Sequence, residues 1–195
     1  MPEHAHRMSH ATYGDYVSWP DDERWEFIEG QPHDMSPTPG RRHQQIVGAL
    51  HARIHNYLRQ AGRCEVYVAP FDVRLPVSDE PDDDVHSVVQ PDIAVICDPA
   101  KLDDKGCRGA PDWIIEVLSP STAAKDQIQK LALYEKHGVA HYWLVHPPDC
   151  IVTVYTLLPG RGDAGTYGGR PAVHAMEGTL ASGLFDDLVI DWSEV

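Results

Sequence analysis

The apolar positions of residues 42–61 recur every three or four residues, which is the spacing of one face of an α-helix. They are Ile46, Val47, Leu50, Ile54, Tyr57 and Leu58. Gly62 follows them and is a typical helix stop. A second helix is predicted over about 122–137, because Ser119-Pro120-Ser121-Thr122 offers N-cap side chains and His137-Gly138 offers an end.

Strands are predicted where β-branched and aromatic residues gather in short runs between turn residues. Residues 64–77 form one long strand or two short ones around Pro70. Further strands are predicted over 88–98, 112–119, 141–147 and 150–158. Before all of these, the pattern predicts a short helix after Thr12, a turn broken by Pro20, a strand entry near Trp25, and then a hairpin or loop rich in Gly and Pro.

The order helix, three strands, helix, strand predicts an α/β (α+β) fold in which helices cover a central sheet, with additional N- and C-terminal strands. The strands around Glu116 are apolar on both faces, as the central strands of a covered sheet are. A length of 195 residues favours one domain with a substantial core. We expect residues 1–11 to be flexible, about 12–158 to form the core, and 159–195 to add strands or hairpins.

The net charge of the chain restricts the kinds of ligand that we expect it to bind. Sixteen Lys and Arg residues against 30 Asp and Glu residues give a net charge of −14. This counts against DNA as a tight partner, because nucleic-acid binders usually present a basic surface. Clustered carboxylates instead attract a divalent cation. Part of the excess lies in the acidic run 78–84, which we interpret as a solvated loop.

The cysteines and the hydropathy bear on where the protein works. The four cysteines are irregularly spaced and include no CxxC pair, which argues against a structural zinc site, so we expect reduced thiols. The sequence contains neither a run of about 18 apolar residues nor a secretory signal. We therefore expect no membrane span and a cytoplasmic protein.

Glu116 stands out because it lies inside the apolar run DWIIEVLS, residues 112–119. A lone buried carboxylate is costly and is normally neutralised, paired or bound to a metal ion. A salt bridge to a neighbouring Lys or Arg is one interpretation of Glu116, and a metal site is the other.

Two further features suggest a metal site near Glu116. Asp92 opens another apolar strand, although an aspartate there is often only a turn residue. Asp126, Lys130 and Tyr134 form a polar stripe along the predicted helix, although an Asp–Lys pair four residues apart is often surface decoration. If the strands of Asp92 and Glu116 are neighbours, they lie ~4.8 Å apart and both carboxylates reach one ion.

Mg²⁺ suits such a site, because it typically takes one or two protein carboxylates and leaves its other positions to water and substrate phosphate. Mn²⁺ is the alternative ion. The backbone carbonyl of Val117 is a further candidate ligand. Lys130 would orient or activate the attacking water, or neutralise charge that develops on a phosphate. Two carboxylates, a metal ion and a lysine predict the hydrolysis of a phosphodiester.

The linked motifs resemble the Uma-two family of restriction-endonuclease-like proteins, within the PD-(D/E)XK nuclease superfamily. The resemblance covers about residues 12–158 and is carried by WEFIEGQPHDMSPTPGRRHQQIV, VVQPDIAVICD, GAPDWIIEVLSPST and KDQIQKLALYEKHGVAHYWLVHP. It implies a restriction-endonuclease-like core of order α-β-β-β-α-β, the same order that the hydrophobic pattern predicts.

By that resemblance, Asp92 takes the place of the superfamily's metal-binding aspartate, and Glu116 that of the first acidic residue of the (D/E)XK motif. The lysine position of that motif holds Leu118, and Lys130 in KLALY is the matching lysine, with Lys125 as the alternative. The spacing from Lys130 to Tyr134 is similar to the QxxxY helix motif of some related nucleases.

Glu26 and His43 match further polar positions of the family's N-terminal motif. The resemblance implies that they join the site, Glu26 as a supporting acid and His43 as a phosphate contact. From the residues alone, Glu26 is as readily a surface strand residue and His43 a helix-entry residue.

The leading hypothesis is a Mg²⁺- or Mn²⁺-dependent endonuclease that acts on nucleic acid, with DNA as the expected substrate. One alternative is a binding or assembly module of the same fold with a weak or idle metal site, which the acidic charge and the displaced lysine favour. The other is a hydrolase of small phosphoesters, which must approach fewer phosphates. A homodimer is expected, because restriction-type enzymes cut two strands with two sites and closed pairs are the commonest oligomers.

Overall fold

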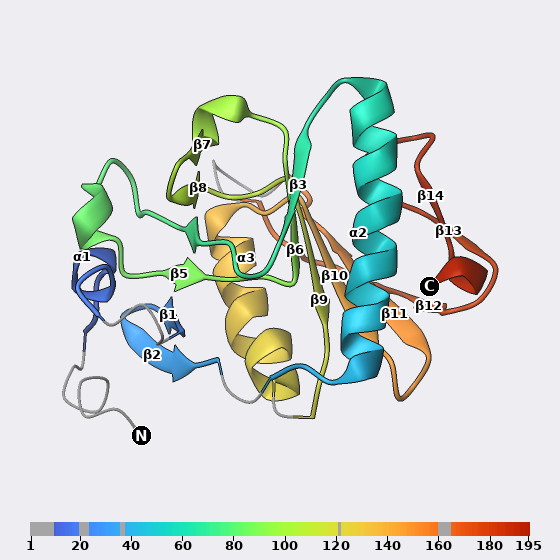
Figure 1. The fold of residues 1–195 in the computed structure, drawn as a ribbon, viewed down its shortest axis with the longest axis horizontal. Coiled ribbons are helices and arrows are strands. Elements are labelled where there is room, and N and C mark those ends of the chain that lie inside the picture. The colour runs from blue at the N-terminus through green and yellow to red at the C-terminus, as the bar shows by residue number, and fades with distance from the viewer. Residues whose placement is uncertain (1–9, 20–23, 36–37, 121, 160–164) are drawn as a thin grey trace.

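The computed structural model describes residues 10–19, 24–35, 38–120, 122–159 and 165–195. A long helix packs against one face of a sheet, and a second helix and a second sheet lie on the other side (Figure 1). Most of the segment expected to be flexible lies outside the described residues. Its last residue, Ala11, is buried and donates its backbone N–H to the Gly30 carbonyl at 2.9 Å.

The central sheet has six strands in the order β12-β11-β10-β9-β6-β3. β9 and β10 run parallel, and the other neighbours are antiparallel. The strands are β3 (Glu65–Val68), β6 (Ile93–Ile96), β9 (Trp113–Val117), β10 (His141–His146), β11 (Ile151–Thr156) and β12 (Ala172–Ala175).

A second sheet, here called the N-terminal sheet, has the order β2-β1-β5-β4-β8-β7. Its strands are β1 (Trp25–Ile28), β2 (Gln31–Asp34), β4 (Val73–Arg74), β5 (Val88–Val89), β7 (Leu102–Asp103) and β8 (Gly106–Arg108). A separate hairpin joins β13 (Thr179–Ala181) to β14 (Val189–Asp191). Short helical turns are α1 (Tyr13–Tyr16) and the 3₁₀ turns Asp82–Asp84, Pro99–Lys101 and Trp192–Glu194.

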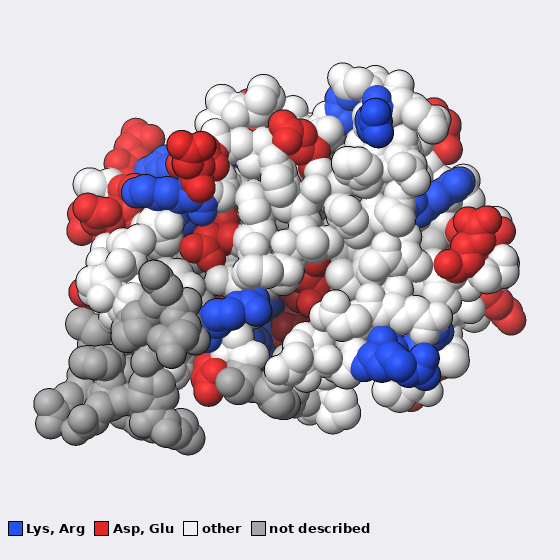
Figure 2. Space-filling model, viewed as in Figure 1, with Lys and Arg blue, Asp and Glu red and all other residues white. Residues whose placement is uncertain are grey.

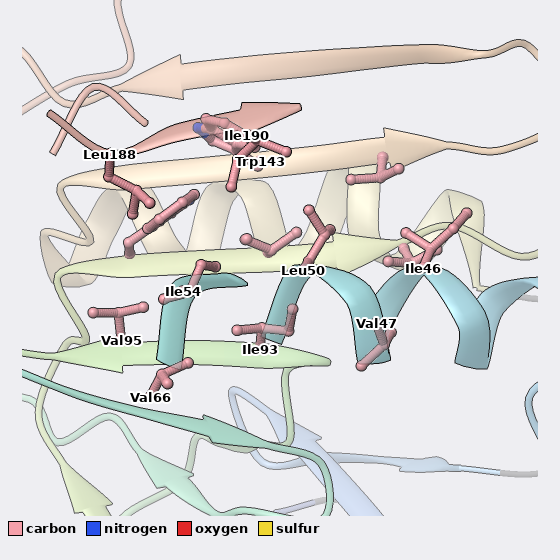
Figure 3. Close-up of a cluster of buried hydrophobic side chains, with 14 of the residues drawn as sticks. Ile46, Val47, Leu50, Ile54, Val66, Ile93, Val95, Trp143, Leu188 and Ile190 are labelled. Atoms are coloured by element: carbon pink, nitrogen blue, oxygen red, sulfur yellow. The ribbon is translucent and has the colours of Figure 1, made fainter. Parts of the chain in front are cut away.

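The long helix α2 (Arg41–Ala61) covers one face of the central sheet. Its buried apolar residues belong to the stripe predicted from the pattern and pack on β6, β9 and β10, while the segment around β14 closes the same cluster (Figure 3). Gly62 ends the helix in the left-handed conformation, with φ of 63°, as predicted.

The helix predicted over 122–137 covers the opposite face of the central sheet. Its first part, Lys125–Lys130, is π-helical, and α3 (Leu131–His137) continues it as a regular α-helix. The pattern predicts the helix but not the π segment, because π- and α-helices differ in the partner of each backbone hydrogen bond and not in composition. Leu133 and Tyr134 of α3 pack between the central and N-terminal sheets.

The predicted order of elements is confirmed as α2, β3, β6, β9, α3, β10. Residues 64–77 form two strands, β3 and β4, which belong to different sheets. The strands β7 and β8 were missed, because the sequence around them is dominated by charged residues and glycine. Among the described residues, no helix has the length and apolar character needed to cross a lipid bilayer.

The interpretation of the acidic run 78–84 as a solvated loop is wrong for Asp82. The fully buried guanidinium of Arg74 binds Asp82 Oδ2 at 2.6 Å and Asp103 Oδ1 at 2.6 Å. A buried cation requires such partners, so Asp82 is held against the fold. The sequence did not show this, because the burial of Arg74 follows from the pairing of the very short strand β4.

The expectation of reduced thiols is wrong for two of the four cysteines, because Cys64 and Cys97 form a disulfide. β3 and β6 pair with Glu65 opposite Ile96, so the next pair along the register brings Cys64 opposite Cys97. Their wide separation in the sequence concealed this cross-strand pairing. Cys107 and Cys150 are free thiols, the first buried and the second exposed.

Thiol counting tests this correction. In protein purified without reductant, we expect one thiol, that of Cys150, to react with Ellman's reagent under native conditions and a second, that of buried Cys107, to appear on unfolding. All four should react after reduction. In Cys64→Ser, a third thiol should appear without reductant. Four reactive thiols in the unreduced parent would contradict the disulfide.

Candidate functional site

Asp92 and Glu116 lie opposite one another on neighbouring strands. β6 and β9 pair with Ile93 opposite Ile115, and the next position along this register places Asp92 opposite Glu116. The backbone N–H of Asp92 donates to Glu116 Oε2 at 3.3 Å, and the N–H of Val117 donates to Asp92 Oδ2 at 2.8 Å. The prediction that their strands are neighbours is confirmed, and the two side chains face the same side of the sheet.

The helix that follows β9 brings Lys130 onto Glu116. Lys130 Nζ lies 2.8 Å from Glu116 Oε1, and the Tyr134 hydroxyl donates to the same oxygen at 3.1 Å. Asp126 Oδ1 lies 3.7 Å from the same ammonium, and Asp126, like Lys130, is buried. The stripe Asp126, Lys130, Tyr134 therefore faces inward and is not surface decoration. The salt-bridge interpretation of Glu116 also holds, with Lys130 as the partner.

Glu26 reaches the same cluster from the N-terminal sheet. It is 0% exposed, so the surface interpretation of Glu26 is wrong. One carboxylate oxygen lies 2.7 Å from Lys130 Nζ and the other binds Lys125 Nζ. Two lysines five residues apart share one partner because the intervening segment is π-helical, and bonds between residues i and i+5 bring such residues to the same face.

His43, the third residue of α2, contacts Asp92. Its Nε2 lies 3.0 Å from Asp92 Oδ2, and its imidazole lies against the Val117 backbone. Nδ1 of His43 is buried without a hydrogen-bond partner among the described residues. The helix-entry interpretation of His43 is confirmed, and its side chain also lines the cavity between these groups, while a phosphate contact stays a prediction.

These groups line a cavity of about 380 Å³. In the space-filling view, acidic side chains lie recessed in a hollow over β6 and β9 with basic side chains beside it (Figure 2). Its wall is drawn from β1, β2, the start of α2, the residues before β6, the end of β9 and the π segment: Glu26, His33, Asp34, His43, Gln90, Asp92, Glu116, Val117, Ser119, Thr122, Lys125, Asp126 and Lys130 among others.

The cavity carries more carboxyl groups than cations. Burial raises the pKa of Glu116 to about 8 in spite of Lys130. Burial also acts on Glu26, but Lys130 and Lys125 outweigh it and lower its pKa to about 2. Burial alone would lower the pKa of Lys130, yet Glu116, Glu26 and Asp126 raise it well above its usual value. Lys130 is therefore an ammonium, and the cluster has room for further positive charge.

The excess of carboxyl groups over cations in the cavity raises the question of whether a divalent ion fits there. Asp92 and Glu116 line the same cavity, and so does Val117, the residue that follows Glu116. Among the described residues, no group of three or more His, Cys, Asp or Glu side chains converges as a complete metal-binding set. An ion that takes two carboxylates, a carbonyl and water needs no such set, and Mg²⁺ is of this kind. The donor chemistry of the site thus fits Mg²⁺ or Mn²⁺.

Several cavity residues were not singled out as site candidates from the sequence, and two of them, His33 and Gln90, lie beside Glu26. His33 lies directly opposite Glu26 in the β1–β2 hairpin. The turn Glu29-Gly30 has positive φ at both residues, as two-residue hairpin turns require, so turn chemistry could have fixed this register. Gln90 donates its backbone N–H to Glu26 Oε1 at 2.9 Å. No sequence signal marks Gln90, because its partner comes from a distant strand.

The fold is shared with a solved structure from Anabaena variabilis that is described as a putative nuclease belonging to DUF820. The two structures match with a TM-score of 0.71 at 18% sequence identity, over 94% of this chain and 96% of that one. At this identity the match concerns the fold alone. The class of protein is therefore that of a mixed α+β protein with a nuclease-like fold.

Family membership follows from the sequence comparison. The Uma2 (Uma-two) family model, described as "Putative restriction endonuclease", matches residues 13–182, and the chain belongs to this family. The resemblance drawn from the motifs is confirmed. An uncharacterized protein of Synechocystis sp. is 26% identical over 133 residues, 67% of this chain. The match spans 65% of the length of that relative.

The central role of Lys130 in the buried cluster can be tested by stability. In Lys130→Met, three buried carboxyl groups lose their shared ammonium, so we expect the free energy of unfolding to fall by roughly 3–5 kcal/mol. Denaturant unfolding measures this. Lys136→Met is the matched control, because Lys136 pairs with Glu29 on the surface, and a change below about 1 kcal/mol is expected there. Equal losses in the two variants would contradict the buried-cluster interpretation.

Proposed function

We propose that this chain is a Mg²⁺- or Mn²⁺-dependent nuclease that hydrolyses phosphodiester bonds of nucleic acid, with DNA as the expected substrate. The observation that carries the proposal is that Asp92, Glu116 and Lys130 converge on one cavity, with Lys130 Nζ 2.8 Å from Glu116 Oε1. Membership of a family described as restriction endonucleases supports the same class of activity.

Asp92, Glu116 and the Val117 carbonyl would hold the ion. When bound, a divalent ion stabilises negative charge on the reacting phosphate and favours the ionisation of water. Lys130 remains an ammonium among its carboxylates, so it donates hydrogen bonds and stabilises charge but does not accept a proton. Tyr134 donates to Glu116 and fixes the orientation of that carboxylate.

Glu26 acts as a positioning residue, because it holds both lysines of the π segment. Lys130 is the lysine next to Glu116 and takes the catalytic role. Among the described residues, Lys125 binds Glu26 alone, and it is the more exposed of the two lysines, so it is suited to contact a substrate phosphate.

A nucleic-acid substrate has to approach the site against the repulsion from a chain with a net charge of −14. Arg41 and Arg42 are exposed in the first turn of α2, which has no acidic residue, and His43 of the same turn lines the cavity. Cations at a helix N-terminus oppose the helix dipole, and local costs of this kind are typical of functional sites. We infer that these arginines draw a phosphate backbone toward the cavity that His43 lines.

The remaining parts of the proposal concern the setting of the protein. Cleavage of both strands of a duplex is simplest with two copies of the site, so we propose a homodimer. A single domain over residues 1–195 and a cytoplasmic location are proposed from the sequence.

Cleavage assays test the catalytic assignment. With Mg²⁺ or Mn²⁺, we expect the parent protein to cut plasmid DNA and chelation to abolish cutting. Asp92→Asn should lower the rate by at least about 100-fold, because it removes a charged metal ligand.

Asp98→Asn is the matched control, since Asp98 lies exposed at the opposite end of β6 and carries the same charge change. It should cut like the parent. Parent protein that cuts no nucleic acid with either ion, or Asp92→Asn that cuts as fast as the parent, would overturn the assignment. Faster turnover of a small phosphodiester than of DNA would favour the small-phosphoester hydrolase.

The idle-module alternative is favoured by one observation: Lys130 already pairs with Glu116 in this structure. Metal binding separates the two proposals without any need for activity. For a metal site, thermal unfolding of the parent should move upward with Mg²⁺ or Mn²⁺, by about 2.7 kcal/mol of added stability at 100 times the dissociation constant. Asp92→Asn should lose the shift and Asp98→Asn should keep it. An unshifted parent at millimolar metal would support the idle module.

A further inference from the structure

A second cavity, of about 560 Å³, lies next to the proposed active site and shares Gln90 with it. The backbone N–H of Gln90 donates to Glu26 in the first cavity. Its side chain faces the second, where Nε2 donates to Asp72 Oδ1 at 2.8 Å and Oε1 accepts from Arg24 Nη2 at 2.9 Å. One residue therefore joins the two cavities by direct hydrogen bonds.

The second cavity presents both an acceptor and donors. Gln90 donates a hydrogen bond to one carboxylate oxygen of Asp72. The other carboxylate oxygen accepts from no donor among the described residues. Arg24 uses one N–H group on Gln90, and a guanidinium has five. A ligand here meets a fixed carboxylate oxygen and guanidinium N–H groups on one side.

Aromatic rings form another part of the same wall. Tyr67 and Phe71 stack on each other with ring centroids 4.2 Å apart and planes only 4° from parallel. Such a pair is already ordered, so a third flat ring can stack on it without further loss of side-chain freedom. Nucleobases bind proteins in this way, because every base has a π face.

The charges of the cavity give a phosphate no net attraction. Asp72, Asp103 and Asp104 line it, against Arg24 and Lys105. Asp103 is further engaged by Arg74. An anionic group would meet these carboxylates, whereas an uncharged ring with N–H donors meets an acceptor.

We propose that this cavity binds an unpaired guanine base of the nucleic-acid strand that the active site cleaves. On the base-pairing edge, the free oxygen of Asp72 accepts from one of the N1–H and 2-amino groups, and the oxygen shared with Gln90 accepts from the other as its second hydrogen bond. Arg24 donates to O6 beside them, and the base stacks on the Tyr67–Phe71 pair. Guanine is the base that offers two donors next to an acceptor on that edge. The edge is occupied in a duplex, so the base must be single-stranded or extruded.

The position of the second cavity indicates how close the bound base lies to the phosphodiester bond that is cleaved. Gln90 precedes Asp92 by two residues, so their Cα atoms are at most about 7 Å apart. The base thus belongs to a nucleotide close to the reacting phosphate. The inference rests on the proposed function only for the choice of a nucleic acid as ligand.

Equilibrium binding tests the cavity without cleavage. The probes are fluorescent single-stranded thymidylate oligonucleotides in which one central base is replaced by guanine, adenine or cytosine, with the metal chelated. We expect the parent to bind the guanine probe at least about 10-fold more tightly than the others, as a paired hydrogen-bonding contact to one base provides. Asp72→Asn should bring the guanine probe to the level of the others.

Asp98→Asn is the matched control, because Asp98 is exposed, lies outside this cavity and carries the same charge change. It should keep the preference for guanine. Tyr67→Leu should weaken all probes by roughly 10-fold, and melting curves establish that each variant is folded. Equal binding of all probes by the parent, or a guanine preference that survives in Asp72→Asn, overturns the proposal. Guanine preference in a protein that cuts nothing would leave the cavity assignment standing and remove the nuclease.

Discussion

The buried ammonium of Lys130 is the interaction on which the rest of the site depends. Three carboxyl groups from three different elements, Glu26 of β1, Glu116 of β9 and Asp126 of the π segment, lie around it. Each would be costly to bury alone, and together they would repel one another. The lysine makes their burial tolerable, and because its partners belong to both sheets, it also ties the N-terminal sheet to the central one at the cavity floor.

That arrangement also bears on the proposed nucleic-acid substrate of so acidic a protein. The acidic groups at the cavity floor are buried, and Lys130 and Lys125 balance most of their negative charge. A divalent cation can balance the negative charge that remains. Arg41 and Arg42 are exposed in the first turn of α2, and the next residue, His43, lines the cavity. The local distribution of charge around the cavity is more informative than the net charge of the whole chain.

Most of the fold could be predicted from the sequence because it depends on local patterns. The stripe of α2, the apolar strands and the Gly stops all follow from spacing. Asp92, Glu116 and Lys130 could be grouped because they lie on consecutive core elements. The burial of Arg74, the Cys64–Cys97 bond and the place of Gln90 could not, since each depends on the register of short strands that are far apart in the chain.

The π segment has a consequence for comparing relatives of this protein. Lys125 and Lys130 share Glu26 only because the helix between them is widened. In a relative whose helix is regular, the first lysine would have to stand four residues before the second to reach the same glutamate. A one-residue gap in an alignment at this point would then mark conserved geometry, and a gap-free alignment would place that lysine opposite Asp126 instead of Lys125.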